Sequence, residues 1–199
     1  MVEKNKRVII VGIPGIGKTT VVSKIKDTIE SKTNFTIYIA EFGKIMLQES
    51  SKLNIGGRDE IRKLSLKKQR ELQNIAAQKI AELSYDIVVI DTHLFISTKE
   101  GYYPGLPKTL LDILQPTNLV LLVAKPHEVY FRRKNDQTRD RDIISVESIQ
   151  NDLEVSRMMV STCSVLSGAP FMILENNDDQ VNDCTEKLFY LLTSSLETK

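Results

Sequence analysis

The chain has 199 residues and a mass of 22.6 kDa, which suits one domain with enough sequence to bury a core. Hydrophobic residues make up 41% and charged residues 27%, so neither a disordered chain nor a fibre is expected. The 27 basic and 26 acidic residues leave a net charge of +1, which argues against a globally basic nucleic-acid-binding protein.

The sequence offers no sign of a membrane or disulfide-stabilised protein. The longest aliphatic run, residues 119–124, is too short to span a bilayer, and residues 1–7 do not resemble a signal peptide. Two cysteines occur, Cys163 and Cys184, without a C-x-x-C pair, which excludes a disulfide framework and a zinc ribbon. We expect both cysteines to be buried in helices. A soluble protein of the cytoplasm is the resulting expectation.

Short apolar runs alternate with longer segments of helical periodicity. Four of the five runs are nearly continuous in Val, Ile and Leu, as is typical of strands buried on both faces of a parallel sheet. The alternation predicts one α/β domain over residues 1–199, a doubly wound parallel five-stranded sheet flanked by helices. Strands are predicted at residues 8–11, 36–40, 87–91, 119–124 and 171–174, and helices at residues 19–31, 145–168 and 181–196.

The sequence G-x-x-x-x-G-K-T lies directly between the first predicted strand and the first predicted helix. Its glycines let successive backbone N–H groups turn inward, and the helix directs its positive end at the same anion. Lys18 is predicted to lie along the β- and γ-phosphates, with the Thr19 hydroxyl on Mg²⁺. The predicted ATP-binding residues are Gly12, Ile13, Pro14, Gly15, Ile16, Gly17, Lys18, Thr19 and Thr20.

A second feature typical of nucleotide sites is an acidic residue at the end of the strand predicted at residues 87–91. This residue is Asp91, and phosphate-loop sites use such an acid to hold the water shell of the metal. His93 follows two residues later, where it either bonds a phosphate or the metal's waters, or packs as a loop residue. With two histidines and no cysteine pair, no transition-metal site is expected.

The residues around Asp91 distinguish between classes of phosphate-loop protein. A GTPase would carry D-x-x-G here, but Thr92, His93 and Leu94 follow Asp91, and no N-K-x-D segment occurs. A motor or transporter ATPase usually needs a longer chain with partner-sensing insertions. A small kinase is therefore the predicted class.

Two local clusters of basic residues suit a kinase whose acceptor is itself a phosphate. Such an enzyme needs no general base, but it needs cations that overcome the repulsion between two polyanions. Residues 52–70 hold seven basic and two acidic residues, and residues 132–141 hold five basic and two acidic ones. Helix-surface charge is the alternative for both clusters. Arg58 and Arg62 are predicted to grip a second nucleotide, and a small lid is predicted around Arg132, Arg133, Arg139 and Arg141.

Six segments of the chain together form a more specific pattern than the phosphate loop alone. They are GIPGIGKTT at residues 12–20, Phe42-Gly43 with Met46, RDEIRKL at residues 58–64, Asp91-Thr92-His93, GYYPGLP at residues 101–107, and RRKNDQTRDRD at residues 132–142. On these segments, from about residue 8 to residue 168, the chain resembles the archaeal-type adenylate kinases, which are short-lid nucleoside-monophosphate kinases. The resemblance implies transfer between ATP and AMP to give two ADP, with Mg²⁺, a mobile lid and a homotrimer.

On the matching positions, the resemblance implies a role for each group of residues. Residues 12–20 hold ATP, and helices within residues 42–84 bind the monophosphate. A short lid covers residues 133–142, and the catalytic residues are Lys18, Arg139 and Arg141. The AMP-facing residues are Phe42, Gly43, Arg58, Arg62 and His93.

Two other functions stay open on the residues alone. Spacing does not distinguish adenine from cytosine or guanine, so another nucleoside monophosphate or a small-molecule alcohol is an alternative acceptor. The other alternative is a non-enzymatic nucleotide-binding module that contacts RNA through residues 52–70. The neutral total charge and the lack of aromatic residues among those basic residues make nucleic acid an unlikely partner.

Overall fold

The computed structural model describes residues 5–52, 55–98, 100–135, 145–194 and 196. Its centre is a parallel sheet of five strands in the order β2-β3-β1-β6-β7. The predicted α/β fold with a five-stranded parallel sheet is confirmed, with strand ends shifted by at most two residues. The strands are β1 (Lys6–Val11), β2 (Ile37–Glu41), β3 (Ile87–Asp91), β6 (Asn118–Val123) and β7 (Phe171–Glu175).

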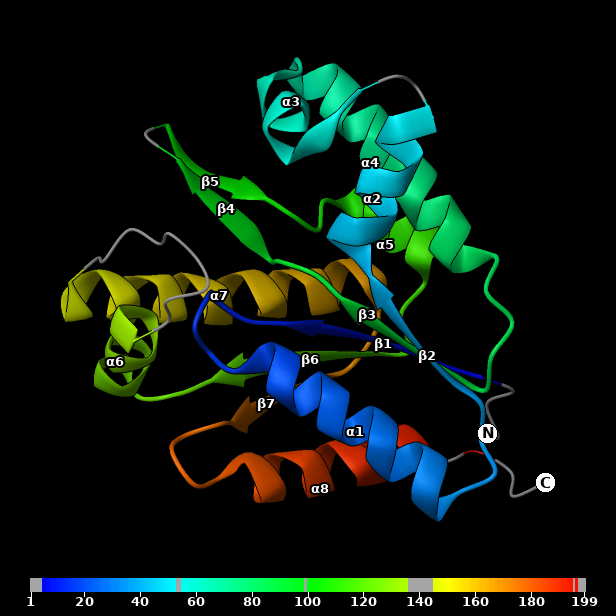
Figure 1. The fold of residues 1–199 in the computed structure, drawn as a ribbon, viewed down its shortest axis with the longest axis vertical. Coiled ribbons are helices and arrows are strands. Elements are labelled where there is room, and N and C mark those ends of the chain that lie inside the picture. The colour runs from blue at the N-terminus through cyan, green and yellow to red at the C-terminus, as the bar shows by residue number, and fades with distance from the viewer. Residues whose placement is uncertain (1–4, 53–54, 99, 136–144, 195, 197–199) are drawn as a thin grey trace.

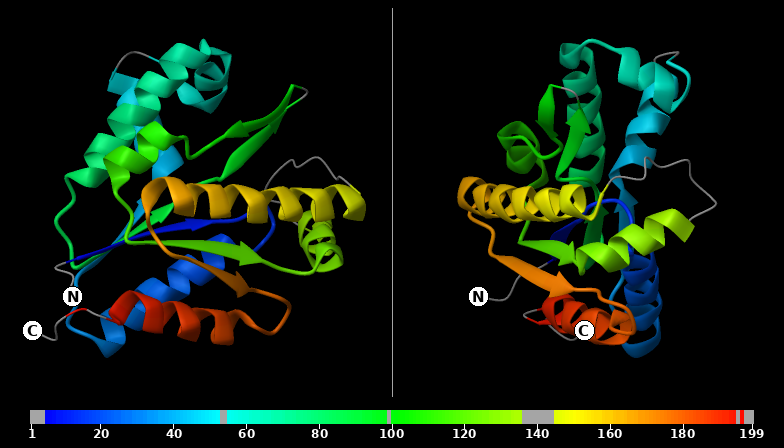
Figure 2. Two further views of the ribbon diagram at one scale, coloured as in Figure 1. Left: turned by 180° about the vertical axis from the view of Figure 1, so that it is seen from behind. Right: turned by 90° about the vertical axis from the view of Figure 1, so that its left-hand side faces the viewer.

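Helices cover both faces of this sheet (Figures 1 and 2). One face carries α1 (Lys18–Lys32) and α8 (Val181–Thr193), which pack against each other. The other face carries α5 (Lys108–Leu114) and α7 (Val146–Ser167), with α4 (Leu66–Ala81) packed against α5. No helix within the described residues is long and apolar enough to cross a membrane.

The hydrophobic core lies between these layers and explains the sequence pattern. Ile9, Ile10 and Val89 in the sheet are completely buried, as are Ile25 and Ile29 on the predicted apolar face of α1. The edge strand β7 is different, because Phe171 and Met172 remain 40% and 38% exposed. A strand at the edge has a neighbour on one side only, so its apolar run does not produce full burial.

Three helices form a lobe above the carboxyl ends of β2 and β3 (Figure 1). This α2–α4 lobe consists of α2 (Phe42–Lys52), α3 (Gly57–Lys63) and the first turns of α4. Arg7 of β1 fixes the opposite end of α4, where its Nη2 donates to Ala81 O at 3.1 Å and its Nη1 to Leu114 O of α5 at 3.0 Å. One side chain thereby satisfies carbonyls at the ends of two helices.

A hairpin that the sequence pattern did not predict follows β3. Its strands, β4 (Phe95–Thr98) and β5 (Gly101–Pro104), pair antiparallel. The rings of Phe95 and Tyr102 pack edge to face at 4.8 Å, and Tyr102 Oη donates to Asp152 Oδ1 of α7 at 3.1 Å. Burial, followed by this hydrogen bond, raises the pKa of the Tyr102 phenol. The hairpin is therefore tied to α7 and does not project freely.

Both cysteines lie in helices and are buried, as predicted. Cys163 of α7 and Cys184 of α8 are free thiols. Burial raises the pKa of Cys163, and burial together with the charge of Asp183 raises the pKa of Cys184 to about 11. Both thiols are protonated at neutral pH and act as small apolar side chains.

The ends of α7 follow the sequence signals closely. Ser145 caps its first turn, and its Oγ accepts a hydrogen bond from Ser148 N at 3.2 Å. Gly168 ends the helix in the left-handed conformation, with φ 72°. The predicted extension of α8 to residue 196 is wrong, because this helix ends at Thr193.

Replacing Gly168 with alanine isolates the cost of this helix end. A Cβ at Gly168 meets no atom within 4 Å, so Gly168→Ala is expected to lower the free energy of unfolding by about 1–2 kcal/mol through backbone strain alone. The matched substitution Gly43→Ala, in helical backbone and also in open space, is expected to raise it by up to about 1 kcal/mol. Urea unfolding followed by circular dichroism measures both, and a loss of stability for both variants would contradict the conformational explanation.

Candidate active site

The glycine-rich segment joins the end of β1 to the first residue of α1 at the carboxyl edge of the sheet (Figure 1). Gly15 and Gly17 have φ of 83° and 87°, a left-handed backbone that strains any residue with a side chain. Ile16 N donates to Ile13 O at 3.3 Å and closes a tight turn. Left-handed residues at alternate positions direct backbone N–H groups to one side, next to the positive end of α1. The backbone therefore has the form of an anion-binding loop.

Lys18 and Asp91 form an ion pair beside this loop. They come together because β1 pairs with β3, where Ile10 lies opposite Asp91, and because Lys18 opens α1. Their side chains are 12% and 17% exposed, so water screens the pair only in part. A phosphate that binds Lys18 has to compete with Asp91 for the same ammonium group.

The hydroxyls of Thr19 and Thr20 lie in the first turn of α1, and both residues are exposed. Among the described residues no group of three or more His, Cys, Asp or Glu is placed to hold a metal by itself. Magnesium often keeps several waters and is bound by one or two protein oxygens together with substrate phosphates. The Thr19 hydroxyl and the Asp91 carboxylate are hard oxygen donors at one edge of the sheet, so their chemistry fits a magnesium ion shared with a nucleotide.

Two consecutive arginines of α6 (Pro126–Asn135) bind the back of the loop. Arg133 is 7% exposed, and its Nε donates to Pro14 O at 2.8 Å. A Cβ on Gly15 would lie 2.8 Å from Arg133 Cγ, so the arginine stem rests directly on the loop. Arg132 Nη1 reaches Ile16 O at 3.4 Å. Both arginines were predicted to belong to the lid, and in the structure both contact loop carbonyls.

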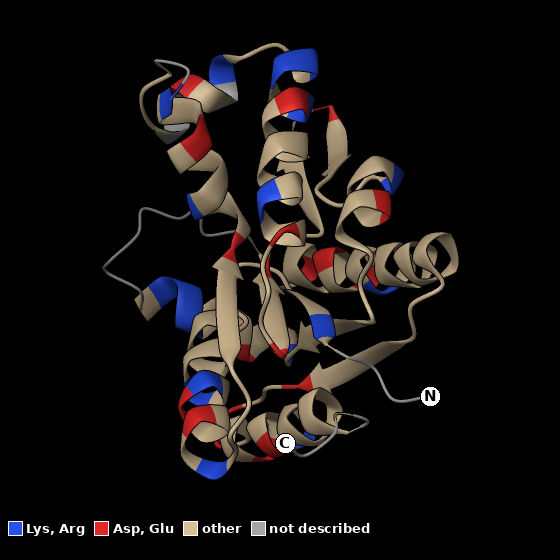
Figure 3. Ribbon diagram, turned by 90° about the vertical axis from the view of Figure 1, so that its right-hand side faces the viewer, with Lys and Arg blue, Asp and Glu red and all other residues tan. Residues whose placement is uncertain are grey.

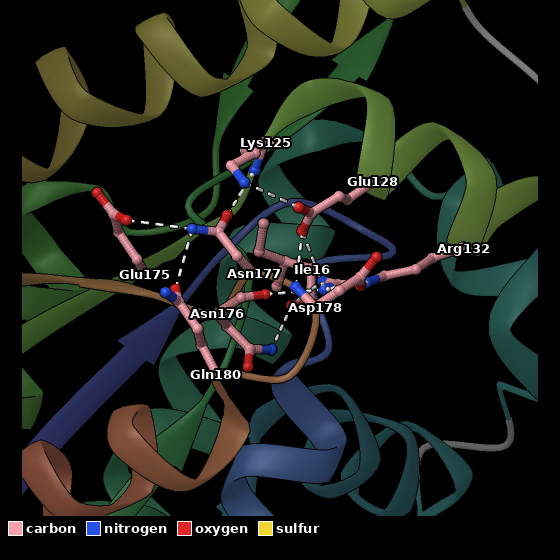
Figure 4. A network of polar contacts seen from close by, with 9 residues as sticks. All are labelled: Ile16, Lys125, Glu128, Arg132, Glu175, Asn176, Asn177, Asp178 and Gln180. Carbon is pink, nitrogen blue, oxygen red and sulfur yellow. Dashed lines mark hydrogen bonds and ion pairs between the residues drawn. The ribbon is translucent and has the colours of Figure 1, made fainter.

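A network of charged groups surrounds Arg132 (Figure 4). Its Nη2 donates to Asp178 Oδ1 at 2.6 Å and lies 3.5 Å from Glu128 Oε2. That glutamate oxygen also accepts from Asp178 N at 2.8 Å, and Lys125 Nζ lies 3.4 Å from Glu128 Oε1. Two carboxylates therefore neutralise Arg132, which is held in the protein and not presented as a free cation.

His93 lies beside the phosphate loop. The side chain of His93 is exposed, and its residue lines one small crevice with Gly12, Ile13 and Pro14. A Cβ on Gly105 would overlap the carbonyl oxygen of His93, so the segments that lead into and out of the hairpin meet more closely than any other residue at 105 permits. The hairpin thus fixes the backbone that follows Asp91.

Four of the five predicted AMP-facing residues, all except His93, lie on the α2–α4 lobe. Phe42 opens α2 and is 5% exposed, whereas Gly43 faces open space. Arg58 and Arg62 belong to α3, but their side chains lie outside what the structure describes. The lobe is attached to the carboxyl end of β2, on the same edge of the sheet as Asp91 (Figure 1).

The described residues of the lobe carry charges of both signs. Figure 3 shows Asp and Glu between the Lys and Arg residues of its helices. At the end of α2, for example, Lys52 pairs with Glu49 at 2.6 Å.

Arg139 and Arg141 lie outside the described residues, as do all of residues 136–142 of the predicted lid. Of the segment 133–142, the structure describes residues 133–135, at the end of α6. This last turn of α6 connects the loop contacts of Arg133 directly to the predicted lid.

The sequence analysis missed the residues behind the loop. Asn176 and Asp178 follow β7 by one and three residues, and Glu128 lies in the first turn of α6. Asn176 meets the loop across 160 residues of sequence, and Glu128 and Asp178 hold Arg132 behind it, so no local pattern relates these residues to the loop. The available signal was their position, because polar residues at the carboxyl ends of neighbouring parallel strands meet at one edge of the sheet.

Solved kinase structures share the fold. Shikimate kinase from Acinetobacter baumannii, in complex with shikimate, aligns with a TM-score of 0.62 and 14% identity, covering 96% of this chain and 95% of that chain. A gluconokinase from Sinorhizobium meliloti aligns with a TM-score of 0.54 and 13% identity, covering 96% and 93%. Identities this low establish the phosphate-loop kinase fold and nothing finer.

Sequence comparison gives the family. A family model described as an AAA domain matches residues 11–150. Adenylate kinase from Methanocaldococcus jannaschii is 37% identical over 191 residues, which are 95% of this chain and 99% of that protein. Adenylate kinase from Pyrococcus horikoshii is 40% identical over 175 residues, 87% of each chain. With this similarity over nearly its whole length, and with the phosphate loop and its lysine in place, the chain belongs to the adenylate kinase family and is a nucleoside-monophosphate kinase.

Proposed function

We propose that this chain transfers the γ-phosphoryl group of ATP to AMP, giving two ADP, and catalyses the reverse reaction. The observation that carries the proposal is the Lys18–Asp91 pair beside an anion-binding loop, in a chain that aligns over 95% of its length with an adenylate kinase. Such a reaction balances adenine nucleotides and needs two phosphate sites within bonding distance.

The donor ATP occupies the loop of residues 12–20 in this proposal. The N–H groups beside Gly15 and Gly17 and the first turn of α1 hold its phosphates. Lys18 leaves Asp91 for the β- and γ-phosphates when ATP binds, because the phosphates carry more charge than one carboxylate. Lys18 is therefore paired with Asp91, with no net charge on the pair, until ATP binds.

Magnesium is part of the proposed donor site. Thr19 offers its hydroxyl, and Asp91, once Lys18 has moved to the phosphates, is free to hold the waters of the ion. When bound, the ion neutralises charge on the β- and γ-phosphates.

The acceptor AMP binds between the α2–α4 lobe and the end of β3, within residues 42–84 and next to His93. Phe42 and Gly43 at the start of α2 line its pocket, and Arg58 and Arg62, which are four residues apart on α3, bind its phosphate. Residues four apart lie on one side of a helix, so both guanidinium groups can reach a single phosphate.

The lid of residues 133–142 closes over both nucleotides. Arg139 and Arg141 then act with Lys18 on the migrating phosphoryl group, whose charge is spread over three oxygens. No general base is needed, because the acceptor phosphate oxygen is already an anion. Closure also excludes water, which would otherwise take the phosphoryl group. Motion of the lid and the lobe limits turnover in this scheme.

The proposal treats residues 1–199 as a single kinase domain with the lobe and the lid as its moving parts. The resemblance to the archaeal-type enzymes adds a homotrimer, for which exposed apolar side chains of α7 and β7 offer surface, among them Met158, Val165 and Phe171. A cytoplasmic location is consistent with two free, buried thiols.

Acceptor preference tests the proposal directly. ADP formation from ATP and magnesium is measured separately with AMP, CMP, GMP, UMP and shikimate, and AMP is expected to give the highest kcat/KM. ADP formation that does not depend on any monophosphate, or preference for shikimate, would contradict the proposed reaction. A bisubstrate dinucleotide is expected to inhibit, since it fills both sites at once.

Lys18→Ala tests the donor site. Loss of a cation whose contact strengthens in the transition state is expected to lower kcat about a hundredfold or more. Lys26→Ala is the matched control. Lys26 lies on the same helix, but its side chain is exposed and its acidic partner is Glu30, at 3.8 Å, so this variant is expected to keep wild-type turnover. Circular dichroism verifies that both variants are folded, and near-normal turnover of Lys18→Ala would exclude the assigned role.

Arg139→Ala tests the lid. We expect ATP affinity to change by less than a few fold, whereas the chemical step loses on the order of 2–4 kcal/mol of transition-state stabilisation. Rapid-quench single-turnover kinetics measures that step without product release, and Lys134→Ala, at the exposed end of α6, serves as the control. An unchanged single-turnover rate would place Arg139 outside the closed site.

A further inference from the structure

The carbonyl oxygen of Ile16, in the middle of the phosphate loop, receives two hydrogen bonds from behind. Asn176 Nδ2 donates to it at 2.8 Å, and Arg132 Nη1 donates at 3.4 Å (Figure 4). The first donor comes from the segment after β7 and the second from α6, so two elements distant in sequence converge on one backbone atom.

The direction of this carbonyl determines the direction of the next amide. The peptide group is planar and trans, so Ile16 C=O and Gly17 N–H point in opposite directions. A carbonyl held toward Asn176 therefore turns Gly17 N–H to the opposite side, away from the buried network. Gly17 has φ 87° and no side chain, so the conformational preferences of this residue do little to prevent rotation of the Ile16–Gly17 peptide group.

Asn176 is rigid enough to hold the carbonyl. The residue is 4% exposed, its N donates to Val123 O at 2.7 Å, and its O accepts from Arg132 Nη2 at 2.9 Å. A Cβ on Gly17 would lie 2.5 Å from Asn176 Nδ2, so the amide group fills the space directly behind the loop. Arg132 is in turn fixed by Asp178 and Glu128.

We propose that Asn176 is a positioning residue of the phosphate-donor site, which fixes the Ile16–Gly17 peptide group so that Gly17 N–H faces the phosphates of ATP. This inference rests on the proposed function, because it takes the loop as the ATP site. Asn176 itself stays behind the loop and acts on the nucleotide only through the backbone.

Two substitutions at Asn176 test the inference. Asn176→Ala removes the donor and is expected to raise the Kd and KM for ATP about five- to tenfold, the effect of one net hydrogen bond. Asn176→Asp keeps the shape of the side chain but places an acceptor against the Ile16 carbonyl oxygen. It is expected to weaken ATP binding at least as much as Asn176→Ala. The KM for AMP is expected to stay within about twofold for both, since the acceptor site does not share this contact.

Asn177→Ala is the matched control. Asn177 is 8% exposed and lies in the same segment, but its side chain bonds Lys125 N, Glu175 and Gln180 and, within the described residues, not the loop of residues 12–20. A general loosening of the segment would therefore weaken ATP binding in the control as well. Thermal unfolding of all variants shows whether a loss of affinity merely follows a loss of stability.

The amide signal of Gly17 gives a readout that does not depend on turnover. In ¹H–¹⁵N spectra of the wild type and of Asn177→Ala, titration with ATP is expected to shift Gly17 N–H downfield as it bonds a phosphate. In Asn176→Ala and Asn176→Asp this shift is expected to shrink. Equal shifts and equal ATP affinities in all four proteins would overturn the inference, while the acceptor assay and Lys18→Ala would still decide the proposed function separately.

Discussion

The structure depends on one constraint of the polypeptide backbone: an amide that faces an anion sends the carbonyl of the same peptide group the other way. A loop that directs several N–H groups at phosphates therefore buries carbonyl oxygens on its far side, and each of these needs a donor. Here Pro14 O receives Arg133 Nε, and Ile16 O receives Asn176 and Arg132. The anion-binding loop therefore requires the polar network behind it, which supplies donors to these carbonyl oxygens.

The second determinant is electrostatic, and the ion pair of Lys18 with Asp91 illustrates it. Burying an unpaired ammonium group is costly, and a charged partner removes most of that cost. Asp91 offers such a partner while no phosphate is bound, because the register of β1 and β3 places it at the end of the loop. In the proposed donor site, the same carboxylate becomes available for magnesium waters when a phosphate takes the lysine. Asp91 is thereby proposed to serve both the empty and the filled site.

The sequence predicted the parts whose meaning is local. Strands β1, β3 and β6 each contain a continuous apolar run. The spacing of the glycines, the lysine and the threonines between Gly12 and Thr20 predicts a phosphate-binding loop. Asn176, Glu128 and Asp178 were not predicted because only the order of strands in the sheet, in which β6 and β7 follow β1, brings them to the region behind the loop. The hairpin at Phe95–Thr98 and Gly101–Pro104 escaped for another reason: it is short and largely exposed, so no alternation of buried and exposed residues marks it. Contacts that form only by tertiary packing leave no pattern in a short stretch of sequence.

The placement of Arg132 and Arg133 also changes how the lid relates to the loop. Both arginines lie in the last turn of α6, where the proposed lid of residues 133–142 begins, and both donate to loop carbonyls. A helix is stiff over ten residues, so a displacement of the end of α6 would disturb Pro14 O and Ile16 O together. Glu128 and Asp178 oppose such a displacement, since they hold Arg132 from the first turn of the same helix and from the segment after β7. These contacts therefore hold the end of α6 against the phosphate loop, so that in the proposed function the carbonyls behind the loop keep their donors whichever position the lid takes.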